Sequence, residues 1–82
     1  MKIKFRMRGD GFINEMFTRA WDHARSEYKD ISLIETGPHG LLYFQTIWNN
    51  ANPGNIIGYE RGGNFEVEMD DKDAFFFALK WS

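Results

Sequence analysis

The clearest structural signal in the chain is the stretch INEMFTRAWDHARSEY at residues 13–28. Its apolar side chains recur every three or four residues, which places them along one face of an α-helix. That face comprises Ile13, Met16, Phe17, Ala20, Trp21, Ala24 and Tyr28. The sequence therefore predicts one long amphipathic helix, with Asp10 placed to cap its start.

Alternating side chains on either side of this helix predict two strands that suit each other. Residues 2–8 turn Ile3, Phe5 and Met7 to the core, and their outward side chains are Lys2, Lys4, Arg6 and Arg8. Residues 64–69 alternate in the same way. Their outward side chains are Glu66 and Glu68, and Asp70 extends this acidic row by one position. Opposite charges facing each other across strands stabilise the pairing by about 0.2–1 kcal/mol each. We therefore expect these strands to be antiparallel neighbours.

Glycine and proline mark the boundaries in the middle of the chain. We expect a strand at Ile31–Thr36 that ends in a turn at residues 37–40. Residues 41–48 follow, and their apolar run fits a strand buried on both faces, although a short helix would carry the same residues. We take the strand as the first interpretation.

The last third of the chain predicts a hairpin and a short helix. Strands at Ile56–Glu60 and Asn64–Met69 are joined through Gly62-Gly63, which supply the positive φ angles of a tight turn. Acidic residues then open a helix at residues 70–81, where they favour the helix start. The whole chain, 1–82, reads as a single α+β domain: an antiparallel sheet with one long helix and a short C-terminal helix, ferredoxin-like or a related two-layer sandwich.

Composition narrows the cellular setting and the classes of function. The chain has no cysteine, which excludes disulfides and cysteine-ligated zinc and fits a reducing, cytoplasmic compartment. The charged opening residues do not resemble a signal peptide, and no apolar run approaches the ~20 residues of a membrane span. We expect a soluble protein that does not bind membranes. A net charge of −2 indicates neither a DNA mimic nor a general nucleic-acid binder.

Residues that carry catalytic or metal chemistry are sparse. His23 lies one helical turn from Arg19 and Glu27, a spacing more typical of an exposed charge ladder than of a metal site. His39 has no partner that the sequence identifies. Asp70, Asp71 and Asp73 lack the ligand spacing of a calcium loop and suit helix capping. We expect no catalytic residue, metal or cofactor, and a small metal-binding protein or enzyme is the least favoured alternative.

The basic row on the first strand offers a second alternative. Lys2, Lys4, Arg6 and Arg8 could follow the phosphates of a nucleic acid across an open sheet face. Such surfaces normally add aromatic rings on the same face, whereas Phe5 points to the core. We favour pairing with the acidic strand over nucleic-acid binding.

The segment Phe75-Phe76-Phe77 cannot be buried on one helix face, because three consecutive positions span roughly 200°. A helical wheel places Phe77 on the core side and Phe76 among charged residues. Three explanations remain open: residues 49–55 or Trp48 fold over Phe76, the segment becomes extended near Leu79, or a partner or second copy covers it. The candidate partner-binding residues are Phe76, Phe75, Trp81 and Trp48.

Residues 65–81, FEVEMDDKDAFFFALKW, resemble the ends of small uncharacterised proteins of tailed bacteriophages. The shared features are a strand, an acidic cap containing Asp-Ala, and an aromatic segment that closes on Leu-x-Trp. The resemblance implies a small accessory protein, acting on a host component. We therefore expect a non-enzymatic protein that works by protein–protein contact. The partner is either a different protein or a second copy of the chain.

Overall fold

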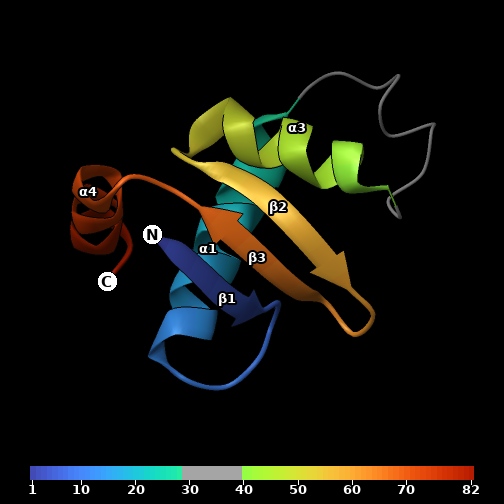
Figure 1. Ribbon diagram of the computed structural model, residues 1–82, viewed down its shortest axis with the longest axis horizontal. Coiled ribbons are helices and arrows are strands. Elements are labelled where there is room, and N and C mark those ends of the chain that lie inside the picture. Colours follow the sequence, from blue (N-terminus) through green and yellow to red (C-terminus); the bar gives the residue numbers. More distant parts are fainter. Residues whose placement is uncertain (29–39) are drawn as a thin grey trace.

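The computed structural model describes residues 1–28 and 40–82, which form the helices and strands shown in Figure 1. In chain order these are β1 (Lys2–Arg6), α1 (Phe12–Glu27), α3 (Leu41–Ala51), β2 (Asn55–Glu60), β3 (Asn64–Glu68) and α4 (Asp71–Trp81). The strand expected at Ile31–Thr36 lies outside the described residues, as does the turn at 37–40 except for Gly40.

The sheet has the strand order β1-β3-β2, and both neighbouring pairs are antiparallel. Lys2 lies opposite Glu68, and Lys4 lies opposite Glu66. The predicted pairing of the basic and acidic strands is therefore confirmed. The basic strand is shorter than predicted, because it ends at Arg6 and the chain turns at Arg8, whose φ is +59°.

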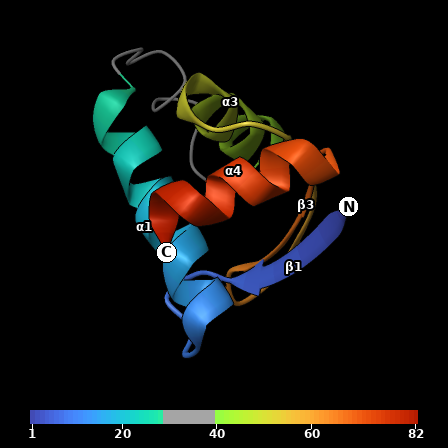
Figure 2. The ribbon, with the colours of Figure 1, turned by 90° about the vertical axis from the view of Figure 1, so that its left-hand side faces the viewer.

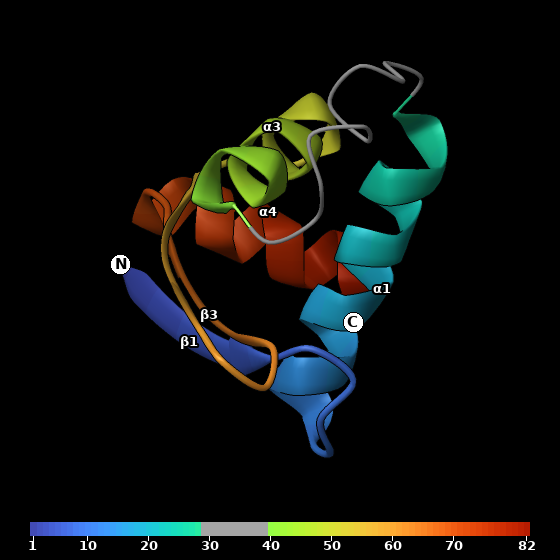
Figure 3. The same ribbon diagram turned by 90° about the vertical axis from the view of Figure 1, so that its right-hand side faces the viewer.

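The helices of the described chain lie on one side of the sheet, as Figure 3 shows with the sheet seen nearly edge-on. The α+β class with an antiparallel sheet is thus confirmed. The ferredoxin-like arrangement is consistent with these elements but stays a prediction. The opposite face of the sheet carries Lys2, Lys4 and Arg6, all exposed, and no described helix covers it.

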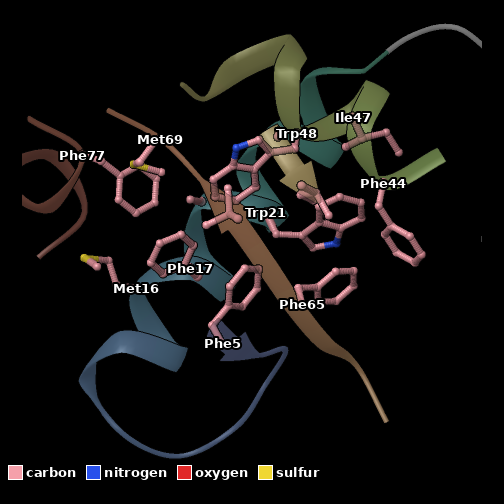
Figure 4. Packing of buried hydrophobic residues seen from close by; sticks show 14 of the residues in the cluster. Phe5, Met16, Phe17, Trp21, Phe44, Ile47, Trp48, Phe65, Met69 and Phe77 are labelled. Atoms are coloured by element: carbon pink, nitrogen blue, oxygen red, sulfur yellow. The ribbon is translucent and has the colours of Figure 1, made fainter. Parts of the chain in front are cut away.

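Aromatic rings fill the core between the sheet and the helices (Figure 4). Phe17 of α1 stacks on Phe5 of β1 with ring centroids 4.6 Å apart, and on Trp48 of α3 at 5.6 Å. Trp21 of α1 packs on Phe44 at 5.4 Å. Large rings bury more area per residue than aliphatic side chains, which suits a chain of this length.

Residues 41–51 form helix α3, so the preferred prediction of a strand at 41–48 is wrong and its helical alternative is right. Tyr43, Phe44, Ile47 and Trp48 are buried, and spacings of three and four residues put them on one helix face. The Trp48 indole N–H donates to the Pro53 carbonyl over 2.9 Å, which satisfies its polar atom inside the core.

Two details of α1 differ from the prediction. Ile13 is 48% exposed, because it lies in the first turn of the helix, before the residues that pack on the sheet. Gly11, not Asp10, occupies the N-cap position, and no side chain caps the helix. The Asp10 carbonyl instead accepts a hydrogen bond from the Asn14 side-chain amide at 2.7 Å.

Glycines with positive φ angles allow two tight turns, one within the β2–β3 hairpin and one before β2. Gly62 and Gly63 have φ angles of +87° and +80° in the β2–β3 hairpin, as the sequence predicts. Gly54, at φ +83°, lies against β3 so closely that a Cβ atom would stand 2.6 Å from the Glu68 carbonyl oxygen. Only glycine combines that backbone conformation with that close approach.

Candidate functional site

Helix α4 has two apolar faces, and its inner face is part of the core. Phe77 is 3% exposed, and its ring lies 4.6 Å from that of Phe17 and 5.7 Å from that of Trp48. Ala74, Ala78 and Trp81 pack against the same cluster. This arrangement confirms the inner face that the helical wheel predicts and fixes α4 firmly on the rest of the molecule.

The opposite face of α4 carries the residues that we call the outer stripe: Lys72, Phe75, Phe76 and Leu79. Their spacing of three, four and seven residues aligns them along one side of the helix. Phe75, Phe76 and Leu79 are 61%, 55% and 62% exposed. In Figure 2, α4 faces the viewer, and no other described segment lies over it.

Two of the three explanations for Phe76 fail for the described residues. Helix α4 continues to Trp81, so the segment does not become extended near Leu79. Trp48 packs on Phe77 from the core side, and Phe76 remains more than half exposed. The third explanation, a partner or second copy that covers Phe76, stays a prediction.

The candidate binding residues therefore separate into three groups. Phe75 and Phe76 lie on the outer stripe. Trp48 does not belong to a contact surface, since its side chain is completely buried. Trp81 is half-buried at the border: its ring lies 5.5 Å from the His23 ring, and its carbonyl accepts a hydrogen bond from the Arg19 guanidinium.

The outer stripe is a modest but concentrated apolar surface. A phenylalanine side chain offers 150–250 Å² for burial, so each half-exposed ring leaves roughly 100 Å² in water. Phe75 and Phe76 also contact each other edge to face, with centroids 5.6 Å apart, which makes one continuous surface. Other large apolar side chains exposed in the described chain include Phe12 and Ile13 at the start of α1, Leu41 and Leu42 at the start of α3, and Ile57 and Tyr59 of β2.

Charged residues border the outer stripe. Asp73 and Lys80 lie on one flank, since seven residues are nearly two full helical turns. Among the residues that the structure describes, the ion pairs join Arg8 to Asp22 and the Met1 amino group to Asp71, so Asp73 and Lys80 belong to neither. Lys80 contacts the Trp81 ring, with its Nζ 5.3 Å from the centroid.

The basic row predicted for nucleic acid is divided in the structure. Lys2, Lys4 and Arg6 lie on the uncovered sheet face, but Arg8 has left the strand. Its guanidinium pairs with Asp22 of α1 at 3.0 Å, and its backbone N–H donates to the Thr18 hydroxyl. The four residues therefore do not form one row.

Acidic side chains neutralise the same sheet face. On the neighbouring strand, Glu68 lies opposite Lys2 and Glu66 lies opposite Lys4. Glu60 lies in line with Arg6, with Asn64 of the central strand between them. An open hollow of about 390 Å³ on this face is lined by two basic side chains, Lys4 and Arg6, and by two acidic ones, Glu60 and Glu66. Phosphate attraction is weak where both signs alternate at this distance. The aromatic ring of β1, Phe5, is buried.

The residues weighed for metal binding lie apart. In the described ranges, no group of three or more histidine, aspartate or glutamate side chains could hold a metal ion. His23 contacts Trp81, and His39 lies outside the described residues. Asp70 is the N-cap residue of α4, with Asp71 and Asp73 in the first turn, although no side chain makes a capping hydrogen bond.

The sequence alone did not group Leu79 with Phe75 and Phe76, and it did not show that Asp73 and Lys80 border that group on one flank. A helical wheel places Phe75 and Leu79 on the flanks of the inner face, and the structure shows both more than 60% exposed beside Phe76. The signal was the spacing of Leu79, three residues from Phe76 and four from Phe75. Asp73 and Lys80 are recognisable only once the outer stripe has been defined.

Comparisons with known proteins give no match to this chain among protein-family models, curated proteins or solved structures. None of the helices in the described residues combines the length and apolar character that crossing a membrane requires.

Proposed function

We propose that this chain is a small non-enzymatic accessory protein that binds another protein through the outer stripe of α4. The observation that carries the proposal is the exposure of Phe75, Phe76 and Leu79 on a helix whose other face is buried in the core. Large apolar side chains gathered on one exposed surface are typical of interaction sites.

The surface is already formed on a helix that packs against the core. Phe77, Ala74 and Ala78 hold α4 against the core, so binding does not have to order the helix. A recognition element that is already in place loses less conformational entropy on association. The outer stripe therefore suits direct docking into an apolar groove of a partner.

The arrangement around the stripe also supports an interface. Aromatic side chains at the centre and charged side chains at the edge are the usual anatomy of protein interfaces. Here the aromatic pair Phe75 and Phe76 is central, with Asp73 and Lys80 beside it. The charges would select orientation, and the rings would supply most of the affinity.

The phage-like end of the chain suggests the partner's origin. Residues 65–81 include the whole of α4, so the segment with the resemblance is also the segment with the outer stripe. We propose a host component, met in the cytoplasm of the infected cell, as the target of this accessory protein.

Nucleic-acid binding through Lys2, Lys4 and Arg6 has less support. Their sheet face carries three basic and three acidic side chains, and its nearby ring, Phe5, is buried. A binding surface for phosphates needs an excess of positive charge.

A pull-down from cells that naturally contain the protein tests the proposal, run with nuclease and in moderate salt. We expect one dominant protein to be retained, and Phe76→Ser to reduce its recovery at least about tenfold, as for a central interface residue. Phe12→Ser is the matched control, because Phe12 is similarly exposed at 60% but lies on α1. Recovery that disappears with nuclease, or that ignores Phe76→Ser, would contradict the proposal.

A further inference from the structure

The outer stripe has an internal symmetry that fits a second copy of the same helix. Its four positions, 72, 75, 76 and 79, are spaced evenly about a point between Phe75 and Phe76. Reversing the direction of the helix exchanges the levels of Phe75 and Phe76 along the helix axis, and those of Lys72 and Leu79. Such a surface matches itself when two copies meet antiparallel about a two-fold axis, which is the requirement of a symmetric dimer.

The apolar contacts of this arrangement are complementary. Each Phe75 would lie beside Phe75 of the second copy, and each Phe76 beside its Phe76, so four rings meet at the axis. Aromatic rings favour the edge-to-face and offset geometries that Phe75 and Phe76 already adopt within one chain, 5.6 Å apart. At each end, the aliphatic stem of Lys72 would cover Leu79 of the second copy while its ammonium group stays in water.

The flanking charges favour the antiparallel direction. Asp73 lies near the start of α4 and Lys80 near its end, on the same flank. An antiparallel copy therefore brings Asp73 of each chain to Lys80 of the other, in two equivalent pairs. In a parallel copy the two charged flanks would lie on opposite sides of the interface, so these pairs could not form.

We propose that the outer stripe of α4 binds the outer stripe of a second copy, antiparallel, with the two-fold axis between Phe75 and Phe76. This inference rests on the proposed function and adds a second occupant of the same surface: in the free protein two copies cover each other's outer stripe, and the dimer dissociates when the host component binds there. The exposed apolar area is small beside the roughly 800 Å² that each partner buries in a standard interface. The dimer is accordingly weak, with a dissociation constant in the micromolar range or above.

Charge exchange tests the arrangement by sedimentation of the full chain over a series of concentrations. Asp73→Lys and Lys80→Asp each turn two attractive pairs into two repulsive ones, so each variant alone should dimerise about tenfold more weakly. Mixed together, the two variants should form a heterodimer at least as stable as the wild-type dimer, because every Lys then faces an Asp. The double variant Asp73→Lys/Lys80→Asp should also recover dimerisation.

The design separates dimerisation from effects within one chain. Lys80→Asp also removes the contact with Trp81, whereas Asp73→Lys does not, so equal losses point to the pair between copies. Recovery in the mixture shows that both variants are folded. Single variants that dimerise like the wild type would overturn the antiparallel arrangement, as would a mixture that stays monomeric.

A wild-type chain that remains monomeric at all concentrations would overturn the second copy as occupant. That result leaves the proposed function standing if the pull-down still retains a different protein through Phe76. If Phe76→Ser changes neither the self-association nor the retained proteins, the proposed function fails as well.

Discussion

Three consecutive phenylalanines of α4 occupy two different environments. Phe77 is enclosed by Phe17 and Trp48, whereas Phe75 and Phe76 remain more than half exposed. Identical side chains in adjacent positions therefore serve different purposes: one holds the helix in place, and the other two present a surface.

Serine substitutions separate these purposes. Phe77→Ser removes a buried ring and leaves a cavity, so we expect a loss of about 3–5 kcal/mol in the free energy of unfolding. Phe76→Ser removes an exposed ring and should cost less than about 1 kcal/mol. Chemical denaturation of both variants measures the difference. Equal losses would mean that Phe76 is a core residue and that the outer stripe has been misassigned.

Gly54 tests a different constraint at the same scale. A Cβ atom there would lie 2.6 Å from the Glu68 carbonyl oxygen, in addition to the strain of a positive φ. We expect Gly54→Ala to destabilise the fold by about 2 kcal/mol or more. Gly62→Ala is the matched control, since Gly62 shares the positive φ, and its nearest neighbour would be at 3.5 Å. Thermal unfolding measures the effect. An equal decrease in the melting temperature of both variants would rule out the close approach at Gly54.

At the scale of elements, α1 is the helix on which the core is assembled. Trp21 is buried against Tyr43 and Phe44 of α3 and Phe65 of β3, so one side chain joins three elements. Trp21→Ala should therefore cost roughly 3–5 kcal/mol, read from denaturant unfolding. A variant with wild-type stability would contradict the packing of α1 between these elements.

Some elements could be predicted from the chain and others could not, for physical reasons. Helix α1 and the pairing of β1 with β3 follow from periodic patterns that extend over several turns or residues. In residues 41–48, Leu41 to Phe44 form an apolar run that fits a buried strand as well as a helix. Tertiary contacts of α3 with α1 and β2 decide between them, and these contacts are not local.

The candidate site was partly predictable for a related reason. A helical wheel separates Phe76 from Phe77 without knowledge of the fold. It cannot show that Trp48 is enclosed, because that depends on how α3 packs against α1. The wheel leaves Phe75 and Leu79 on the flanks, because a flanking position faces the core or the solvent depending on how α4 is tilted against the core.

At the scale of the whole molecule, two faces differ in character. The uncovered sheet face carries charges of both signs in register, with Lys4 opposite Glu66, whereas the outer stripe of α4 is apolar. Balanced charge suits contact with water, and the apolar stripe suits contact with protein. Of these two faces, the outer stripe is the better suited to binding another protein.

Balanced charge on the sheet leads to a prediction about nucleic acid. A fluorescently labelled single-stranded oligonucleotide should show no salt-dependent binding to the wild-type chain by anisotropy at low ionic strength, because no excess of cations would release counterions. Glu66→Lys together with Glu68→Lys should create such binding. Strong oligonucleotide binding by the wild-type chain that weakens steeply with salt would instead support nucleic-acid binding through the basic residues of β1.

Photo-crosslinking from α4 tests the central claim most directly, with p-benzoylphenylalanine in place of Phe76 in cells that naturally contain the protein. The outer stripe as a binding surface predicts crosslinks to protein from position 76, either to a second copy or to a different protein. The same group in place of Phe12, similarly exposed but on α1, should give few. Absence of protein crosslinks from position 76, or equal crosslinking from both positions, would contradict the account.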